Sequence, residues 1–338
     1  MFGIEPYQFI SFLRQLGLAI AGAASLWGMV FLYLASKRTA NDPSGVVLAW
    51  IGLRLQLLLY GGGILALGAW TIMVSIIPAS AHEGITLIST KAQILAAAQT
   101  MTPVYALFAV FLVLGLFVKN FKLKTTHGGI SWFYAFSFLL VFVAISYYTD
   151  WRGLPMEKIV FHAFHGFHSI FTLGTVLTLD FMFISSRSSV ILQQHIFSLF
   201  PKISKVIWIG LSLDLLSVLL IFPDAVILSP RLFFAQTVVG ILIINGVLLS
   251  GVITRRILSL LEAGKHEQSK AWMLFANVAG IISVSSWMSI YMVDFFPQLT
   301  LTYGELLAVY GGIIAVLFIL HELWERFDRP DIPLPSES

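Results

Sequence analysis

The chain has 338 residues, of which 58% are hydrophobic and 11% are charged, and its formal net charge is +3. A soluble domain carries about 25% charged residues, so this composition indicates an integral membrane protein. Cysteine is absent, which excludes disulfides, thiolate metal ligands and thiol catalysis. The sequence contains no Walker A loop, dinucleotide-binding glycine fingerprint or HExxH motif, so ATP-driven transport, dinucleotide binding and zincin proteolysis have no support.

Apolar runs long enough to cross a bilayer recur along the chain. They predict nine membrane-spanning helices, at 12–36, 47–77, 92–118, 130–149, 159–186, 204–222, 232–254, 271–293 and 303–324. The first run follows Arg14 but is longer than the apolar core of a secretory signal, so we interpret it as a span rather than a cleaved leader.

Basic residues predict which way the chain faces. They concentrate in the turns after the first, third, fifth and seventh spans, which hold Lys37, Arg38, Lys119, Lys122, Lys124, Arg187, Lys202, Lys205, Arg255, Arg256, Lys265 and Lys270. The positive-inside rule assigns these turns to the cytoplasm, which places the N-terminus outside and the C-terminus inside. We therefore expect a multi-pass protein of a bacterial-type plasma (inner) membrane. Its partner is the lipid bilayer, and no nucleic-acid partner is expected.

A weak internal repeat is present. Shifted by 149 residues, Gly17 aligns with Gly166, and shifted by 140, Trp132 aligns with Trp272. The order of spans and basic turns also repeats, which favours two tandem units over shared hydropathy alone. The predicted fold is all-α, a polytopic bundle of two four-helix units and a terminal helix. The expected divisions are a first unit at 1–150, a second unit at 151–298, and the ninth span with a short cytoplasmic tail at 299–338.

The fifth predicted span differs from the others because it is polar along one side. At about 100° per residue, His162, His165 and His168 fan over one sector, and Asp180 returns to the angle of His162. Thr172 and Thr175 share that sector. Ionisable groups in a bilayer cost free energy and usually mark a site. This stripe should therefore face protein, a cofactor or water rather than lipid.

The three histidines suggest ligation chemistry. Imidazole binds haem iron or copper, and i, i+3 spacing lets two neighbours share a metal or approach separate partners. We assign His165 and His162 as metal ligands, and His168 as a further cofactor-binding residue. Arg231, at the outer start of the seventh span, would hold an anionic group such as a haem propionate. The alternatives are an interfacial polar cluster, a proton relay and, for Arg231, simple snorkelling to the interface.

Two aspartates provide a different hypothesis. Asp214 lies near the middle of the sixth span, and Asp180 toward the cytoplasmic end of the fifth. Such carboxylates bind cations, transfer protons or pair with a base, and the candidate bases are Arg54 and Arg187. A pair that only orients two helices is the structural alternative.

Small residues at one-turn spacing predict close helix contacts in lipid. The candidates are the run 61–63 with Ala66, Ala276 with Gly280, and Gly246 with Gly251.

The segment HGFHSIFTLG, from His165 to Gly174, resembles the copper-resistance protein D superfamily of bacterial membrane proteins. That superfamily includes uncharacterised four-helix relatives and, more distantly, HemJ-type protoporphyrinogen oxidase. Arg231 and Asn245 in a later helix, and SVSSW ending at Trp287, also resemble it. The resemblance covers about 160–290 and implies a four-helix bundle that binds copper or b-type haem, with His165 as the ligand.

The chain departs from that superfamily at one position. The tryptophan often found shortly before the superfamily's glycine is absent, and Thr172 and Leu173 stand there. The first unit has Trp27 and Gly28 but no histidine. The histidine therefore stands in the second unit and the tryptophan next to a glycine in the first, whereas the superfamily has both in one helix.

The leading functional hypothesis is a protein that binds haem b or copper in the outer half of its second unit. It would serve redox chemistry or metal handling with a membrane or periplasmic partner, through His165, His162, His168 and Arg231. One alternative is an ion- or proton-coupled transporter that uses Asp214 and Asp180. Another is a structural or assembly subunit of a membrane complex. The sequence does not determine whether the protein is an enzyme.

Overall fold

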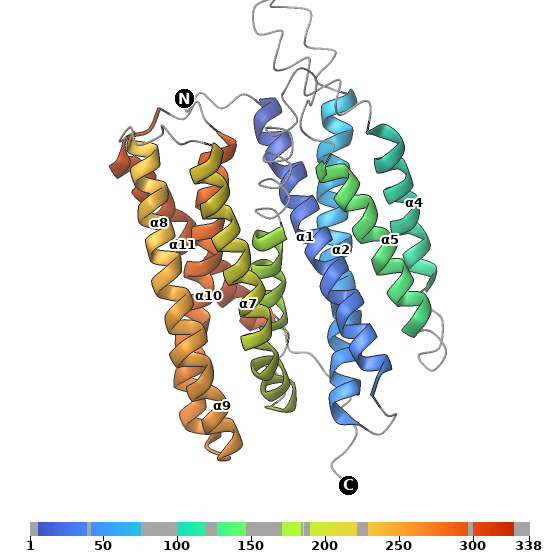
Figure 1. Cartoon of the computed structure of the whole chain (residues 1–338), viewed down its shortest axis with the longest axis vertical. Helices are drawn as coiled ribbons and strands as arrows, with labels where there is room; N and C mark the ends of the chain where they lie inside the picture. The colour runs from blue at the N-terminus through green and yellow to red at the C-terminus, as the bar shows by residue number, and fades with distance from the viewer. Residues whose placement is uncertain are drawn as a thin grey trace, which may run out of the picture. The chain divides into compact units, whose positions relative to one another are not determined.

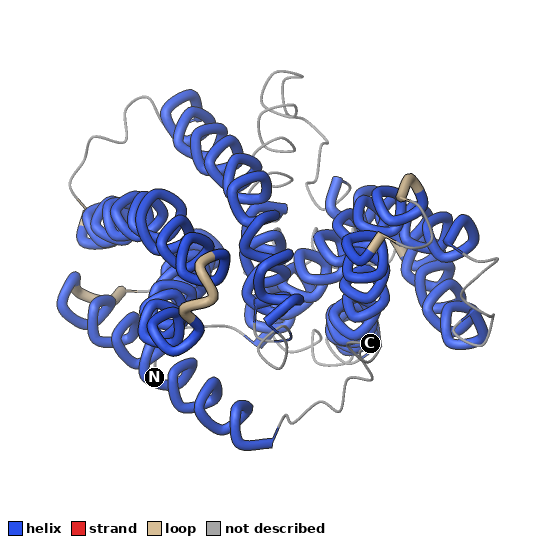
Figure 2. The backbone as a smooth tube through the Cα atoms, turned by 90° about the horizontal axis from the view of Figure 1, so that it is seen from below, coloured by secondary structure: helices blue, strands red, loops and turns tan. Residues whose placement is uncertain are grey.

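The computed structural model describes residues 6–38, 42–75, 101–118, 127–146, 171–183, 185, 190–221, 229–296 and 300–327. Within these ranges every regular element is a helix and no strand occurs, as the backbone in Figure 2 shows. The predicted all-α class is therefore confirmed for this part of the chain. The physical reason is that a helix satisfies all its backbone hydrogen bonds within one segment, as a bilayer requires.

The helices follow the apolar runs of the sequence (Figure 1). They are α1 (Pro6–Ser36), α2 (Pro43–Ser75), α4 (Thr102–Val118), α5 (His127–Ser146), the helix Phe171–Phe183, α7 (Val190–Ile221), α8 (Pro230–Val247), η2 (Leu248–Ile253), α9 (Thr254–Glu262), α10 (His266–Phe295) and α11 (Tyr303–Phe327). The segment η2 is a π-helix, and it joins α8 to α9 without a break.

Six of the described helices are long and apolar enough to cross a membrane. They are Gln8–Ser36, Ser44–Ser75, Leu192–Leu213, Pro230–Glu262, His266–Val293 and Tyr303–Leu323. Three shorter apolar helices, Thr102–Leu116, Trp132–Ile145 and Phe171–Phe183, lie inside the other three predicted spans. Each predicted span thus contains an apolar helix, while the count of nine spans stays a prediction.

Helix α7 differs from its prediction at its N-terminal end. It begins at Val190 instead of 204 and continues through Pro201. Lys202 and Lys205 therefore lie on the helix, and their expected place in a turn is wrong. A helix of 32 residues is about 48 Å long at 1.5 Å per residue, which exceeds the hydrocarbon thickness of about 30 Å. Part of α7 can consequently lie among headgroups, where lysine is tolerated.

The chain divides into two compact units. Unit 1 comprises Gly3–Thr178 and Val206–Val226, and unit 2 comprises Leu179–Lys205 and Ile227–Ser338. The predicted boundaries at 150 and 298 stay predictions.

In unit 1, α1 and α2 approach each other closely enough to bring their backbones into contact. A Cβ atom on Gly17 would lie 2.5 Å from the backbone nitrogen of Ala66, and one on Gly62 would lie 2.7 Å from that of Ala21. Because association in lipid depends on van der Waals contact, such small residues stabilise the pair. The predicted role of Gly62 and Ala66 is confirmed, whereas no described atom lies within 4 Å of a Cβ built on Gly61.

Helix α5 is anchored to the same pair by one aromatic residue. Tyr134 is fully buried, and its hydroxyl donates a hydrogen bond to the carbonyl oxygen of Gly52 at 2.5 Å. Its ring occupies the space beside Gly28, where a Cβ atom would lie 2.5 Å from Cζ. Gly28 therefore provides the room that the ring needs.

Unit 2 is held together by hydrogen bonds between apolar helices. The side chain of Asn245 in α8 donates to the carbonyl oxygen of Ala279 in α10 at 2.7 Å. The hydroxyls of Ser286 in α10 and Tyr310 in α11 lie 2.9 Å apart. Polar contacts of this kind fix which faces of apolar helices meet.

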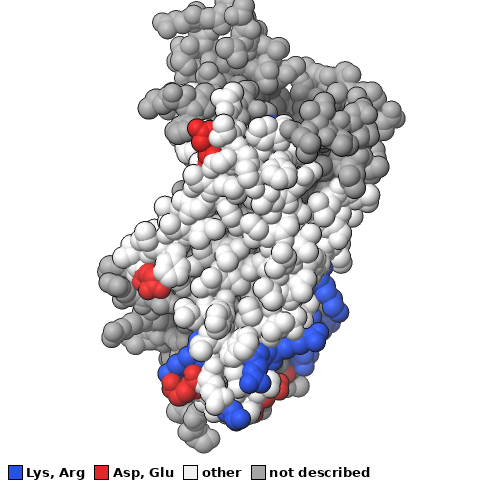
Figure 3. All heavy atoms as spheres, turned by 90° about the vertical axis from the view of Figure 1, so that its left-hand side faces the viewer, with Lys and Arg blue, Asp and Glu red and all other residues white. Residues whose placement is uncertain are grey.

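Charge in the described part of unit 2 is unevenly distributed along its helices. In the view of Figure 3, basic side chains with some acidic ones among them gather toward one end, and a broad surface with few charged side chains follows. The stretches 232–254 of the helix Pro230–Glu262 and 271–293 of α10 contain no charged residue. This pattern is typical of helices that cross a bilayer.

Candidate functional site

Asp180 is the ionisable residue on which the candidate site is built. It lies in the helix Phe171–Phe183, one turn before the end of that helix. The residue as a whole is partly exposed, but its Oδ2 atom is enclosed and has no hydrogen-bond partner among the described residues. An enclosed carboxylate oxygen without a partner is costly, so this position calls for a functional explanation.

Helix α10 supplies the surface beside this carboxylate. A Cβ atom on Gly280 would lie 2.9 Å from Oδ1 of Asp180 and 3.5 Å from its Cγ. The carboxyl group therefore lies directly over a residue without a side chain. The predicted close contact at Gly280 is present, although its neighbour is a carboxylate.

A second polar side chain lies one turn earlier on α10. Asn277 precedes Gly280 by three residues, so both lie on neighbouring positions of one helix face. The Oδ1 atom of Asn277 is enclosed and has no hydrogen-bond partner in the described part of the chain. Two helices that meet at Gly280 thus each carry a side-chain oxygen without a hydrogen-bond partner among the described residues. These oxygens belong to Asp180 and Asn277. Oxygen atoms of this kind accept protons or coordinate small cations.

The second predicted aspartate is placed only through its backbone. Asp214 lies within α7, and its side chain falls outside the described part of the structure. Its candidate partner Arg54 stacks over the ring of Trp50 on its own helix, with 5.2 Å between Cζ and the ring centroid. The functional hypothesis for Asp214 therefore rests only on its position in the sequence, because no described contact involves its side chain.

The predicted cofactor ligands are not among the described contacts. His162, His165 and His168 lie outside the described residues, as does Arg187. Arg231 is described and follows Pro230 in the first turn of α8, behind the N-cap Ser229. No group of three His, Cys, Asp or Glu side chains that could hold a metal occurs within the described ranges. The cofactor assignments stay predictions.

The threonines of the fifth span do face protein, as their helical angle predicts. Thr172 and Thr175 are 2% and 0% exposed, and Oγ1 of Thr175 accepts a hydrogen bond from Nε1 of Trp27 at 3.2 Å. Gly174 lies directly on the backbone of Ala19. The glycine of the superfamily resemblance thus has a packing role in this chain.

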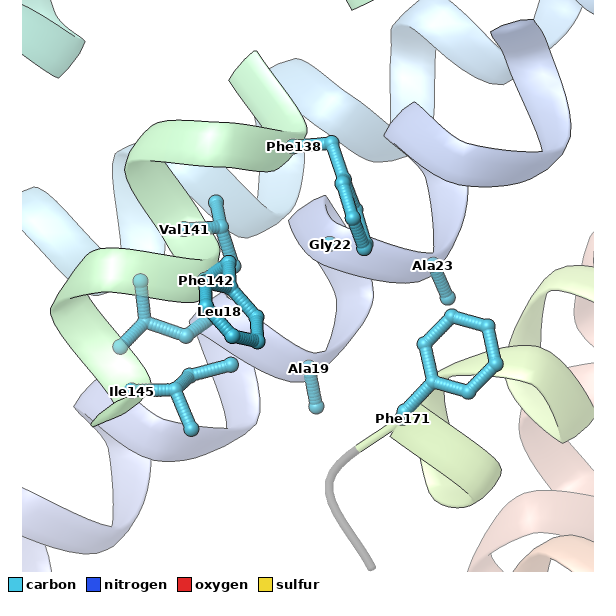
Figure 4. Close-up of a pocket in the computed structure, with 9 residues that line it drawn as sticks. All are labelled: Leu18, Ala19, Gly22, Ala23, Phe138, Val141, Phe142, Ile145 and Phe171. Carbon is cyan, nitrogen blue, oxygen red and sulfur yellow. The ribbon is translucent and has the colours of Figure 1, made fainter. Parts of the chain in front are cut away.

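A small, partly open apolar hollow lies in unit 1 beside that contact (Figure 4). Its walls are apolar and come from α1, α5 and the start of the helix Phe171–Phe183. They comprise Leu18, Ala19, Gly22, Ala23, Phe138, Val141, Phe142, Ile145 and Phe171. None of these side chains can transfer a proton or bind a metal, so the lining offers no group for proton transfer or metal binding.

Sequence reasoning missed a buried polar group on α1. Gln8, Ser11 and Gln15 are 8%, 0% and 2% exposed, and Arg14 beside them is 3% exposed. The signal was available, because i, i+3, i+7 spacing places Gln8, Ser11 and Gln15 on one helix face. The predicted site residues all lie in 151–298, so this face was overlooked.

No family model, curated protein or solved structure matches this chain. Among the described residues, the carboxyl group of Asp180 over Gly280 is the best-defined candidate site.

Proposed function

We propose that this chain is an ion- or proton-coupled membrane protein in which Asp180 carries the coupling ion. The observation that supports this most directly is the enclosed Oδ2 atom of Asp180 without a hydrogen-bond partner among the described residues. An acidic side chain in a membrane helix with an enclosed oxygen that has no partner among the described residues is typical of proton and cation pathways. Asp214, which lies in unit 1, is a separate candidate for the same role.

The packing at Gly280 favours this role over a purely structural one. A carboxylate that only orients two helices is expected to form a pair or a hydrogen bond with both of its oxygens. Among the described residues, Asp180 instead keeps one oxygen without a partner, and its neighbour Gly280 on α10 has no side chain to donate to it. The unsatisfied Oδ1 of Asn277 provides a further acceptor on the same helix.

The membrane arrangement is part of the same proposal. The chain has nine spans in two tandem units in a bacterial-type inner membrane, with the N-terminus outside and the C-terminus in the cytoplasm. The basic ends of the unit 2 helices support this orientation, because positive charge is retained on the cytoplasmic side.

Proton flux into proteoliposomes tests the role of Asp180. Purified protein is reconstituted with the pH dye pyranine inside, and a potassium gradient with valinomycin drives proton entry. Asp180→Asn keeps the size and polarity of the side chain but removes its ionisation, so we expect at least about a tenfold lower initial rate. A parallel series with an imposed sodium gradient distinguishes sodium coupling from proton coupling.

The matched control is Glu262→Gln, which neutralises an exposed carboxylate at the end of α9. This variant should retain the flux of the unmodified protein. Equal flux in Asp180→Asn and Glu262→Gln, under both proton and sodium gradients, would remove Asp180 from the pathway.

Haem b or copper binding through His165, with His162 or His168 and Arg231, is a second proposal. The spacing of the histidines in the sequence supports it, but no described contact does. An oxidised and dithionite-reduced absorption spectrum of the purified protein, with metal analysis, tests it directly. A Soret band that His165→Ala abolishes would support haem. A colourless sample without stoichiometric iron or copper would reject both cofactors.

A further inference from the structure

A rigid basic hairpin closes one end of unit 2. Helix α9 ends at Glu262 and α10 begins at His266, and Gly264 between them has a φ of 68°. The N–H of Lys265 donates to the carbonyl oxygen of Leu260 at 2.9 Å, and that of Gly264 donates to Leu261 at 3.1 Å. This pair of bonds is a Schellman motif, which glycine favours because of its positive φ. The connection between the helices is therefore fixed.

Four cationic side chains surround this connection, and all are exposed. We call them the α9–α10 tip; they are Arg255, Arg256, Lys265 and Lys270. Basic side chains gather at that end in Figure 3. The tip thus presents several positive charges within a short segment.

The orientation of α9 is set by its apolar face. Ile257 and Leu261 are 0% and 2% exposed, and they pack in one cluster with Phe183, Phe197 and Ala276. Burial of this face leaves Arg255 and Arg256 on the opposite, exposed side of the helix. The arginines are consequently held outward by the core of unit 2.

The position of the tip along the helix corresponds to the lipid headgroups. The stretch 232–254 is uncharged and spans about 35 Å at 1.5 Å per residue, close to the hydrocarbon thickness of a bilayer. Arg255 and Arg256 follow directly after it. They therefore emerge where phosphate groups lie.

Acidic neighbours neutralise only part of this charge. Glu267 pairs with Lys270 at 2.7 Å, on an exposed surface. Within the described residues, Arg255, Arg256 and Lys265 have no carboxylate within ion-pair distance. The four cations of the tip also outnumber its two carboxylates, Glu262 and Glu267, so the described part of this end keeps an excess of positive charge for an external anion.

From these observations we infer that the α9–α10 tip binds the headgroups of anionic phospholipids in the surrounding bilayer. Guanidinium groups match phosphate oxygens through paired hydrogen bonds, and a basic cluster next to a span attracts anionic lipid. A lipid is favoured over a soluble anion because the tip directly follows an apolar stretch of membrane length. This inference depends on the membrane location and is independent of Asp180.

Native mass spectrometry of the detergent-purified full chain tests this inference. Dioleoylphosphatidylglycerol and dioleoylphosphatidylcholine are added separately, and the apparent Kd of each is measured. We expect phosphatidylglycerol to bind at least about fivefold more tightly, and this preference to shrink at high salt. Substituting Arg255, Arg256, Lys265 and Lys270 with Gln should reduce the preference to less than about twofold.

The control removes two positive charges elsewhere. Lys37 lies over the ring of Tyr33 at 5.3 Å, and Arg38 pairs with Asp42 at 3.6 Å, so both already have partners. Lys37→Gln with Arg38→Gln should leave the lipid preference within about twofold of the unmodified protein. An equal loss in this control would show that net charge, rather than the tip, attracts the lipid.

Two further results would overturn the inference. One is equal affinity of the unmodified protein for both lipids, which requires no variant and is unaffected by folding defects. The other is full displacement of phosphatidylglycerol by millimolar inorganic phosphate, which would identify a site for a soluble anion. If the fourfold variant is not monodisperse, Arg255→Gln with Arg256→Gln and the salt series carry the test.

Discussion

Nε1 of Trp27 donates a hydrogen bond to Oγ1 of Thr175 at 3.2 Å, although 148 residues separate them in the sequence. The contact joins α1 to the helix Phe171–Phe183 within unit 1, one residue after Gly174. Gly174 itself lies against the backbone of Ala19 in α1. Trp27 and Gly174 therefore both pack at the contact between these two helices.

Gly174→Ala should destabilise the protein. The added methyl group would collide with the backbone of Ala19, which cannot move without shifting α1. Overpacking of this kind costs about 1–3 kcal/mol. The midpoint of thermal unfolding in detergent, followed by tryptophan fluorescence, should fall.

The matched control is Gly68→Ala in α2, where no described atom lies within 4 Å of the added Cβ atom. Alanine is a better helix former than glycine by about 1 kcal/mol, so this midpoint should stay or rise. Equal midpoints for the two variants would contradict the close contact at Gly174.

Asn245→Leu should weaken the contact between α8 and α10. It removes the hydrogen bond to the carbonyl oxygen of Ala279, 2.7 Å long and buried, and interhelical bonds in membranes contribute about 0.6–1.7 kcal/mol. Ser250→Ala is the control, because Oγ of Ser250 bonds to Gly246 within its own helix. The midpoint of thermal unfolding should fall further for Asn245→Leu than for Ser250→Ala. A larger fall for Ser250→Ala would show that the bond of Asn245 does not stabilise the contact between α8 and α10.

Gly280→Ala should reduce ion flux more than stability. The new Cβ atom would lie 2.9 Å from Oδ1 of Asp180, and the end of that side chain can rotate away. Displacing the carboxyl group by about 1 Å is expected to slow the flux at least about tenfold. The proteoliposome assay and thermal unfolding, measured on the same sample, separate the two effects.

Gly251→Ala provides the comparison, since no described atom approaches that position within 4 Å. Gly246 and Gly251 were predicted to contact another helix. At Gly251 this contact is absent within the described structure. Flux through Gly280→Ala at the rate of Gly251→Ala would mean that the carboxylate position is unimportant.

Single cysteines can determine the orientation of unit 2, because the chain has none of its own. Ser259 in α9 and Thr300 before α11 are both exposed. The positive-inside rule predicts that a membrane-impermeant maleimide labels Thr300→Cys in intact cells but labels Ser259→Cys only after permeabilisation. The reverse pattern would invert the proposed topology, and labelling of both in intact cells would contradict a span between them.

The sequence by itself determined the class of the protein and the apolar segments. Hydrocarbon length and the cost of unpaired backbone groups act on each segment separately, so composition within one run is sufficient. The same local physics places Arg255 and Arg256 just past an uncharged stretch. Hydropathy does not determine where a helix ends, because a helix can continue beyond the hydrocarbon. Helix α7 therefore begins at Val190, before the apolar run.

The tertiary structure decided which residues meet. In lipid, every apolar face of a helix is equally acceptable to its surroundings, so periodicity does not identify partners. Only the packed helices place Gly174 on Ala19, Asn245 against Ala279, and the carboxylate of Asp180 over Gly280. These contacts depend on the shapes of two helices together, and for that reason neither helix's sequence specifies them alone.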